Sequence, residues 1–227
     1  MAKVKFSALI SEMRNKLNGS VFSKNRAGNY LRNKVTPVNP QTAFQTAVRA
    51  VLTAASQSWR ALSEAQRLAW NSAVANFQGT DIFGDVKTPS GINLYNKLYI
   101  NASTIGFPPS TTPPALVTSP GVPDAFVNTT APGTVTVSSG TLAAVPAGVS
   151  LVLSMTPSVS AGKNFLKGKS RIIVSIGSTN TFPYDASAAY AAKFGPIVAG
   201  EKIGWELQYI GNATYIAGPK ITGAEIN

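Results

Sequence analysis

The fold of the N-terminal half is decided by residues 39–77, which read NPQTAFQTAVRAVLTAASQSWRALSEAQRLAWNSAVANF. Asn39 is a residue type that caps helices, and Pro40 at the first helical position loses no hydrogen bond that the helix needs. Apolar residues then recur at helical spacing and form one stripe: Phe44, Val48, Val51, Leu52, Ala55 and Trp59. The stretch therefore predicts a helix that begins at Pro40 and buries this stripe.

A second helix is predicted immediately after the first. Ser63 and Gln66, three residues apart, match the pattern of a capping box at its start. A third helix is predicted from Ser90, with Leu94, Leu98 and Ile105 on its apolar side. We therefore expect a compact three-helix module over residues 39–105. Its predicted core consists of Phe44, Val48, Val51, Trp59, Leu62, Trp70 and Phe77.

The residues before this module, 1–38, form a predicted basic arm or hairpin. Residues 4–17 are interpreted as either a short helix or an irregular apolar arm that ends at Gly19. Two short strands, 20–22 and 30–35, then flank residues 23–29. Because Gly28 and Asn29 tolerate positive φ, this pattern predicts a hairpin with a basic tip.

Positive charge is concentrated toward the N-terminus. Residues 1–100 contain thirteen Lys and Arg against four Asp and Glu, whereas residues 101–227 contain seven against five. An anionic partner should therefore meet the N-terminal part first. Two interpretations of the basic hairpin stay open: contact with DNA phosphates, or a solvated face that can meet an acidic neighbouring subunit. The expected polyanion or subunit contacts are Lys24, Arg26, Arg32, Lys34, Arg49, Arg60 and Arg67.

The composition changes beyond residue 105. Residues 106–123 contain six prolines, which disfavour both helix and central strand and predict an extended linker. Apolar residues then alternate with period two, most clearly at 202–210, and a short helix capped by Asp185 is predicted at 185–194. Residues 124–227 are therefore predicted to form an antiparallel β-sandwich of the immunoglobulin or fibronectin type III kind, which makes the fold class α+β.

The chain contains no Cys and no His, and only nine Asp and Glu. These absences exclude disulfides, thiol nucleophiles, Ser-His-Asp triads and zinc sites built on Cys or His. Asp81 and Asp85 lie close together beside Gly84 and could bind a hard cation, although two Asp residues in a loop more often stabilise a turn. We therefore expect a protein that is not an enzyme and that has no cofactor.

Nothing near the start of the sequence resembles a secretory signal peptide. The longest nearly apolar run, residues 142–155, is interrupted by Pro146 and Gly148 and is too short to span a bilayer. We expect a chain that is made without export and that has no membrane partner.

One resemblance covers residues 15–105. It is carried by Asn39-Pro40-Gln41-Thr42, Gln45, Arg49, Trp59-Arg60, Leu62, Gln66-Arg67, Trp70 and Asn93-Leu94-Tyr95-Asn96. This order is similar to a pattern in uncharacterised proteins of tailed bacteriophages, in which a basic arm precedes a helical hairpin and a β-rich domain often follows. The resemblance implies a structural or assembly role in a virion, in the capsid, neck or tail. It also implies synthesis in the host cytoplasm and other virion subunits as partners, and it carries over no catalytic residue.

A second, local resemblance involves about 30 residues. Trp59, Leu62-Ser63, Arg67 and Trp70 look like the centre of an HMG-box, a family that binds and bends DNA through the minor groove. The alternative is a helical hairpin whose two tryptophans form a small core, which the size of Trp favours. The lysine density and the apolar wedge of that family are missing here.

Three functions are therefore weighed. The first is a virion structural protein, expected to form homo-oligomers and to contact other subunits and, non-specifically, nucleic acid. The second is an HMG-like architectural DNA-binding protein. The third is an adhesion or carbohydrate-binding module that would stack sugars on Trp205, Tyr209 and Tyr215. Because Trp205 and Tyr209 alternate with Ile203 and Leu207, they are expected on the core side of their strand.

Overall fold

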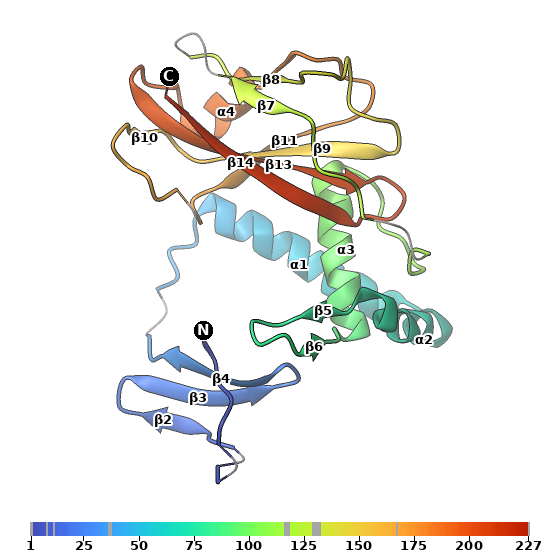
Figure 1. Ribbon diagram of the computed structural model, residues 1–227. Helices are drawn as coiled ribbons and strands as arrows, with labels where there is room; N and C mark the ends of the chain where they lie inside the picture. The colour runs from blue at the N-terminus through green and yellow to red at the C-terminus, as the bar shows by residue number, and fades with distance from the viewer. Residues whose placement is uncertain are drawn as a thin grey trace. The chain divides into compact units, whose positions relative to one another are not determined.

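The computed structural model in Figure 1 describes residues 2–7, 9–10, 12–35, 38–115, 119–128, 133–166 and 168–226. Among these residues it contains four α-helices and several antiparallel sheets, so the predicted α+β class is confirmed. The chain divides into two compact units, Met1–Leu94 and Tyr95–Asn227, which we describe separately. Within the described ranges, no helix combines the length and the apolar character needed to cross a membrane.

The first unit begins with a four-stranded antiparallel sheet in the order β1-β4-β3-β2. Its strands are β1 (Ala2–Lys3), β2 (Asn15–Leu17), β3 (Ser20–Asn25) and β4 (Gly28–Asn33). The predicted hairpin is confirmed as β3–β4, but its tip is shorter than expected, because Asn25 already pairs with Gly28. The Asn25 side chain accepts a hydrogen bond from the Ala27 N–H, and Gly28 takes the positive φ of 105° that closes the turn.

Strand β2 was not predicted, and the helical interpretation of residues 4–17 is wrong. Leu17 pairs with Ser20, so Asn18 and Gly19 form a two-residue turn between β2 and β3. Asn18 has a φ of 50°, which Asn adopts more readily than most residues. The sequence Asn-Gly is a strong hairpin signal, and it outweighs the weak apolar periodicity that favoured a helix.

Helix α1 (Ala43–Ala61) starts later than predicted. Its cap is Thr42 rather than Asn39: the Thr42 hydroxyl accepts a hydrogen bond from the Gln45 N–H, and the Gln45 side chain accepts one from the Thr42 N–H. Gln41 has a φ of 50°, so the backbone is not helical immediately before this cap. The Asn39 side chain instead accepts a hydrogen bond from the Arg49 guanidinium, at 2.8 Å.

The following helices match the prediction more closely. Helix α2 (Glu64–Ala73) starts at the predicted capping box of Ser63 and Gln66, and a 3₁₀ turn, η1 (Val74–Phe77), follows it. Two short strands, β5 (Gly79–Thr80) and β6 (Val86–Lys87), form a hairpin, and helix α3 (Gly91–Ile105) lies where the third helix was expected. A Cβ at Gly91 would lie 2.2 Å from the Asn71 side chain, so α2 and the start of α3 approach closely.

The predicted core of the helical module is only partly correct. Leu62 and Trp70 are buried, and Val51, Trp59 and Phe77 are half-buried. Phe44 and Val48 are exposed, so the prediction that they are core residues is wrong. Helix α1 has 19 residues and is therefore about 28 Å long, whereas the 10 residues of α2 span only about 15 Å. The N-terminal half of α1 consequently extends past the helix that was expected to cover it.

The second unit contains two antiparallel sheets, one of five strands and one of three. One has the order β10-β13-β9-β11, with β14 on the other side of β13, and the second has the order β12-β8-β7. The five strands of the first sheet are β9 (Val149–Met155), β10 (Val159–Ser160), β11 (Arg171–Ile176), β13 (Glu201–Gly211) and β14 (Ala217–Ile226). The other strands are β7 (Phe126–Asn128), β8 (Thr136–Ser138) and β12 (Tyr184–Asp185).

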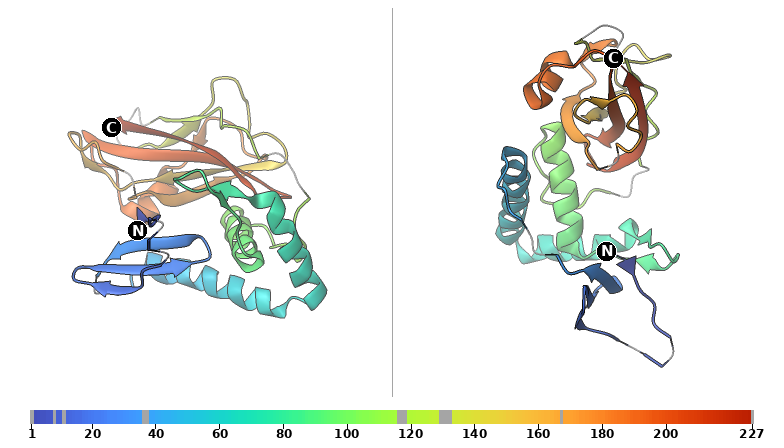
Figure 2. Two further views of the ribbon diagram at one scale, coloured as in Figure 1. Left: turned by 60° about the horizontal axis from the view of Figure 1, so that its bottom comes forward. Right: turned by 90° about the vertical axis from the view of Figure 1, so that its left-hand side faces the viewer.

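Strands β13 and β14 form a long, curved ribbon, which the views of Figure 2 show from two directions. Strand β14 lies at the edge of its sheet and pairs only with β13 among the described strands. Its register shifts by one residue between Ala217 and Lys220, the stretch that contains Pro219. Proline lacks an N–H group, and an edge strand with such an irregularity is a position where a sheet accepts it.

The two sheets of the second unit share one hydrophobic core. Val127 and Val137 of the smaller sheet pack in the same cluster as Leu151, Leu153 and Leu207 of the larger one. Burying a side chain of this size contributes about 1.5–3 kcal/mol, so this cluster is the main source of stability in the second unit. Helix α4 (Ser187–Phe194) adds Tyr190, whose hydroxyl donates to the Thr156 carbonyl at 3.2 Å.

The predicted helix near Asp185 is confirmed, with a different start. Helix α4 begins two residues after Asp185, and the cap position is Ala186, which has no side-chain hydrogen bond. The Asp185 carboxylate nevertheless accepts a hydrogen bond from the Ser187 N–H at 2.9 Å, so it supplies part of the capping that was expected.

The division between the two units falls within α3 rather than in the proline-rich linker at 106–123. The end of this helix belongs to the second unit because its side chains contact the β-rich part directly. Ile105 packs with Val152 and Ile210, and the Asn101 side chain donates to the Tyr215 carbonyl at 2.8 Å. The proline-rich residues also contact this unit, since the Tyr215 hydroxyl donates to the Pro108 carbonyl at 2.9 Å.

Candidate functional site on the N-terminal sheet

The first candidate surface is one side of the N-terminal sheet, which we call the basic face. In an antiparallel sheet, paired residues point to the same side and neighbours along a strand alternate. Val21 pairs with Lys16 on β2 and with Arg32 on β4, so the two cations flank one valine. Tyr30 pairs with Ser23 and with Lys3 and lies two residues from Arg32. The basic face therefore carries Lys3, Lys16, Val21, Ser23, Tyr30 and Arg32.

The cations at the centre of the basic face have no counter-charge among the described residues. In the part of the chain that the structure describes, no carboxylate forms an ion pair with Lys16 or Arg32. Both side chains are exposed. The two cations lie on the strands on either side of β3, so their like charges add to one positive surface that attracts an anionic partner.

The opposite side of the sheet holds its cations differently. Lys24 belongs to this side, where its ammonium lies 3.7 Å from the Glu12 carboxylate. Glu12 also accepts from the Arg14 guanidinium, which lowers the pKa of Glu12 below its ordinary value, with Lys24 contributing further. The aromatic rings of Phe6 and Phe22 pack here with their centroids 6.3 Å apart. This side is therefore largely compensated within the chain.

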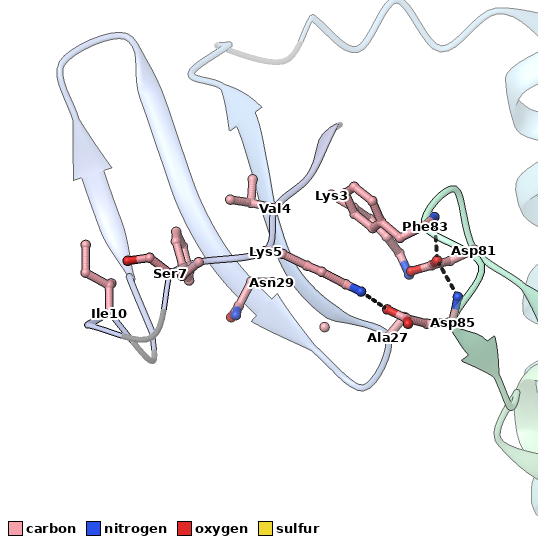
Figure 3. Close-up of a pocket in the computed structure, with 12 residues that line it drawn as sticks. Lys3, Val4, Lys5, Ser7, Ile10, Ala27, Asn29, Asp81, Phe83 and Asp85 are labelled. Atoms are coloured by element: carbon pink, nitrogen blue, oxygen red, sulfur yellow. Dashed lines mark hydrogen bonds and ion pairs between the residues drawn. The ribbon is translucent and has the colours of Figure 1, made fainter.

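Two ion pairs, which we call the clasp, join the N-terminal arm to the loop between β5 and β6 (Figure 3). The Lys3 ammonium lies 2.6 Å from the Asp81 carboxylate, and the Lys5 ammonium lies 2.9 Å from that of Asp85. The Lys5 ammonium also lies 5.4 Å from the centre of the Phe83 ring, within the range of a cation–π contact.

Asp81 organises the β5–β6 turn as well as the clasp. One of its carboxylate oxygens accepts hydrogen bonds from the N–H groups of Phe83 and Asp85, at 2.7 and 3.1 Å. The Lys3 ammonium lowers the pKa of the Asp81 carboxyl most, and these two N–H groups lower it further. The hydrogen bond with Asp85 raises the pKa of Lys5 correspondingly. The Asp81 carboxylate thus performs the turn chemistry that the sequence favoured, whereas the Asp85 carboxylate pairs with Lys5.

A cavity of about 460 Å³ lies beside the clasp, between the arm, the β3–β4 turn and the β5–β6 loop. Its charged lining groups are Lys3, Lys5, Asp81 and Asp85, and each is engaged in the clasp. Among the described residues there is also no group of three or more carboxylates that could hold a metal ion. The cavity therefore offers no unpaired acid or base for chemistry.

The structure separates the cations that the sequence grouped together. Arg32 lies on the basic face and Lys24 on the opposite side, while Arg26 is at the exposed tip of the β3–β4 turn. Lys34 follows β4, and its backbone N–H donates to the Gly19 carbonyl at 2.8 Å. The remaining cations lie on helices: Arg49 and Arg60 on α1, and Arg67 on α2.

Sequence reasoning missed Lys16, which lies on the basic face beside Val21. The error follows directly from the missed strand β2, because a helical or irregular arm gives Lys16 no fixed neighbour. The signal that could have found it is the Asn18-Gly19 turn.

A second, larger cavity of about 680 Å³ lies on the β13–β14 ribbon in the other unit. Phe165 and Leu166 line it together with Glu206 and Lys220, whose charged groups pair at 2.9 Å. Of the suggested sugar-stacking residues, Trp205 is half-buried, packs against the core and also lines this cavity. Tyr209 is buried, and the Tyr215 hydroxyl bonds to Pro108.

Comparisons of this chain with protein-family models, with curated protein sequences and with solved structures find no match.

Proposed function

We propose that this chain is a structural or assembly protein of a tailed-bacteriophage virion, and not an enzyme. It would work in the capsid, neck or tail through contacts with other subunits and, without sequence specificity, with nucleic acid. The resemblance of residues 15–105 to phage proteins suggests the class of particle. The basic face supplies the physical argument for the contact.

The observation that carries the proposal is the pair Lys16 and Arg32, exposed on one side of the N-terminal sheet without a carboxylate partner among the described residues. Three of the four carboxylates in residues 1–94 are engaged in ion pairs with other cations. The excess positive charge of this unit is therefore presented outward. Such a surface attracts polyanions, with an affinity that depends strongly on salt.

The neighbouring groups suit contact with a phosphate backbone. Ser23 and Tyr30 place hydroxyl groups on the same side as Arg32. Lys, Arg, Ser and Tyr side chains are those that proteins use to contact DNA phosphates, which position a protein without reading sequence. An acidic subunit surface offers carboxylates to the same groups, so assembly contacts can use the basic face in the same way.

The β-rich unit would act as the outward or bridging part of the subunit. We propose that its two core-sharing sheets form a sandwich of the immunoglobulin or fibronectin type III kind, as their antiparallel pairing and common core suggest. The fully buried side chains of this core leave its outer strands available for neighbours.

No observation favours the two alternative functions. Leu62 and Trp70, which carry the resemblance to an HMG-box, are buried, so they serve the core of the helical hairpin and not a wedge between bases. A carbohydrate-binding module needs exposed aromatic faces, whereas Tyr209 is buried and Trp205 is half-buried against the core.

The contact is tested by fluorescence anisotropy with a labelled DNA duplex of about 30 base pairs, titrated across a series of salt concentrations. We expect binding at low salt that weakens steeply as salt rises. The double variant Lys16→Gln/Arg32→Gln should bind more weakly and reduce the salt slope by about 2. The matched control Lys163→Gln/Lys169→Gln removes the same charge from the other unit and should keep most of the slope.

Equal losses in both double variants would show that net charge, and not the basic face, drives binding. The virion assignment itself is tested by mass spectrometry of purified complete particles. Absence of the chain at stoichiometric copy number would overturn it.

A further inference from the structure

One cation of the basic face, Lys3, is held by a carboxylate of the same chain. Lys3 pairs with Tyr30 across β1 and β4, so its side chain belongs to the same side of the sheet as that of Arg32. Arg32 is its diagonal neighbour, at about 7–8 Å. The Lys3 ammonium nevertheless lies 2.6 Å from the Asp81 carboxylate. Asp81 therefore occupies the place on the basic face where an external anion would bind to Lys3.

The surroundings of this ion pair have room and charge for a second anion. A third cavity, of about 380 Å³, borders the pair and is lined by Lys3, Thr80, Asp81, Ile82 and Lys87. Lys87 is exposed, and no carboxylate among the described residues forms an ion pair with it. This cavity thus combines two cations and a threonine with a single carboxylate. Its positive charge is in excess, which suits an anion with several acceptor oxygens.

The Asp81 carboxylate can release Lys3 and still keep hydrogen-bond donors. One of its oxygens accepts from the Phe83 and Asp85 N–H groups, at 2.7 and 3.1 Å, and these bonds do not involve Lys3. The second ion pair of the clasp, between Lys5 and Asp85, keeps the arm attached to the loop. If a phosphate takes the place of the carboxylate, Lys3 exchanges one charge-assisted hydrogen bond for another.

We propose that a phosphate group of a bound nucleic-acid duplex displaces the Asp81 carboxylate from Lys3 and enters the third cavity beside Lys87. This inference rests on the proposed contact between the basic face and nucleic acid, and it adds an internal competitor to that contact. A duplex that contacts Arg32 and Lys16 holds further phosphates close to Lys3, because DNA carries about one negative charge per 1.7 Å of its axis. Both competing anions are therefore present at a high local concentration.

The competitor makes the basic face selective for dense negative charge. A polyanion with closely spaced phosphates displaces Asp81 and gains the contact with Lys3. An acidic protein surface offers carboxylates of the same kind as Asp81, and a single one of them is not held near Lys3 by its neighbours. Such a surface would contact Lys16 and Arg32 and leave the clasp closed.

A double-mutant cycle tests the proposal, with the anisotropy titration of the labelled duplex as the measurement. Asp81→Asn should bind several-fold more tightly than the wild type, with a salt slope steeper by about 1, because Lys3 is then free. In the Lys3→Gln background the same substitution should change little. Asn keeps a side-chain oxygen that can accept from the loop N–H groups, so the turn should persist. The control Glu12→Gln removes the same charge from the opposite side of the sheet and should leave the slope unchanged.

Carboxyl footprinting of the wild type by carbodiimide labelling and mass spectrometry follows the displacement directly. The Asp81 side chain is only 7 % exposed while Lys3 holds it. Saturation with duplex should increase the labelling of Asp81, although binding covers the surface around it. The labelling of Glu12, on the opposite side of the sheet, should not change.

An equal gain from Asp81→Asn with and without Lys3 would overturn the proposal, because Asp81 would then act only as a distant negative charge. Unchanged labelling of Asp81 in the saturated complex would overturn it too. So would an equal gain when poly-glutamate replaces the duplex, since phosphate would then have no preference. Failure of the proposed function has a different signature: Lys16→Gln/Arg32→Gln would bind the duplex as tightly as the wild type. A wild type that binds no duplex even at low salt would overturn both.

Discussion

The indole of Trp205 on β13 lies directly against Gly223 on β14, so closely that a Cβ added to Gly223 would lie 2.2 Å from the indole Cζ2 atom. Trp205 also packs against the core that both sheets of the β-rich unit share. The glycine therefore provides the space that lets a large side chain cover the edge of this core.

The variant Gly223→Ala should destabilise the β-rich unit. The methyl group would force the rigid indole to move, and overpacking of this kind costs about 1–3 kcal/mol. Chemical unfolding followed by circular dichroism would measure the change. The control is Gly177→Ala, because a Cβ at Gly177 meets no atom within 4 Å. If both variants unfold alike, the contact between Trp205 and Gly223 contributes nothing specific.

The clasp should open in acid. Because Lys3 lowers the pKa of Asp81 below the ordinary 3.8, the stabilisation is fully present above that value and is lost as the pH falls through the lower pKa of the folded protein. The Val4 N–H, which donates to the Asn29 carbonyl at 3.1 Å, reports on the attached arm. Asp81→Asn should speed hydrogen exchange of this group at pH 6.

The difference between Asp81→Asn and the wild type should then shrink as the pH approaches 3, since protonation removes the same charge. High salt should reduce this difference only a little, because the Asp81 side chain is 7 % exposed and a partly buried ion pair is weakly screened. A difference that stays constant from pH 6 to pH 3 would contradict the role assigned to the carboxylate.

The capping box at the start of α2 should contribute measurably to the first unit. Ser63→Ala removes the hydroxyl that accepts from the Gln66 N–H, and such losses cost about 0.5–2 kcal/mol. Thermal unfolding would detect this as a lower midpoint. Ser72→Ala makes the same chemical change at an exposed position inside the helix, where Ala is favoured, and should leave the midpoint unchanged or raise it.

The end of α3 should depend on the bond between Asn101 and the Tyr215 carbonyl. Asn101→Ala leaves that partly buried carbonyl without its donor and should destabilise the second unit by about 1–3 kcal/mol. Asn93→Ala, at an exposed position of the same helix, is the control. Urea unfolding of the two variants would separate the specific bond from a general effect on helix propensity.

Local sequence signals predicted several helices and strands well. The pair Ser63 and Gln66 fixed the start of α2, because a capping box is determined within four residues. The alternation at 202–210 located β13, because a half-buried strand imposes period two on its sequence. The cap of α1 was predicted at Asn39 and lies at Thr42, because both residue types cap helices and the local pattern named only the first.

Relations between distant residues could not be predicted. The apolar spacing along α1 predicted which side of the helix is apolar, but not how much of that side another element covers. Phe44 and Val48 are exposed. The clasp joins residues 78 positions apart, and no local pattern specifies Asp81 as the partner of Lys3. The basic face was half predicted: Arg32 was named, but Lys16 needed the pairing of β2 with β3.

The edge strand β14 carries features that oppose aggregation when many copies of the chain lie close together. A ten-residue strand with an open side is a template on which other chains can build cross-molecular sheets and aggregate. Pro219 offers no N–H to such a template, and the charged Lys220 beside it resists a dry, stacked neighbour. Copies of this chain could thus lie close together without forming intermolecular β-sheets along this edge.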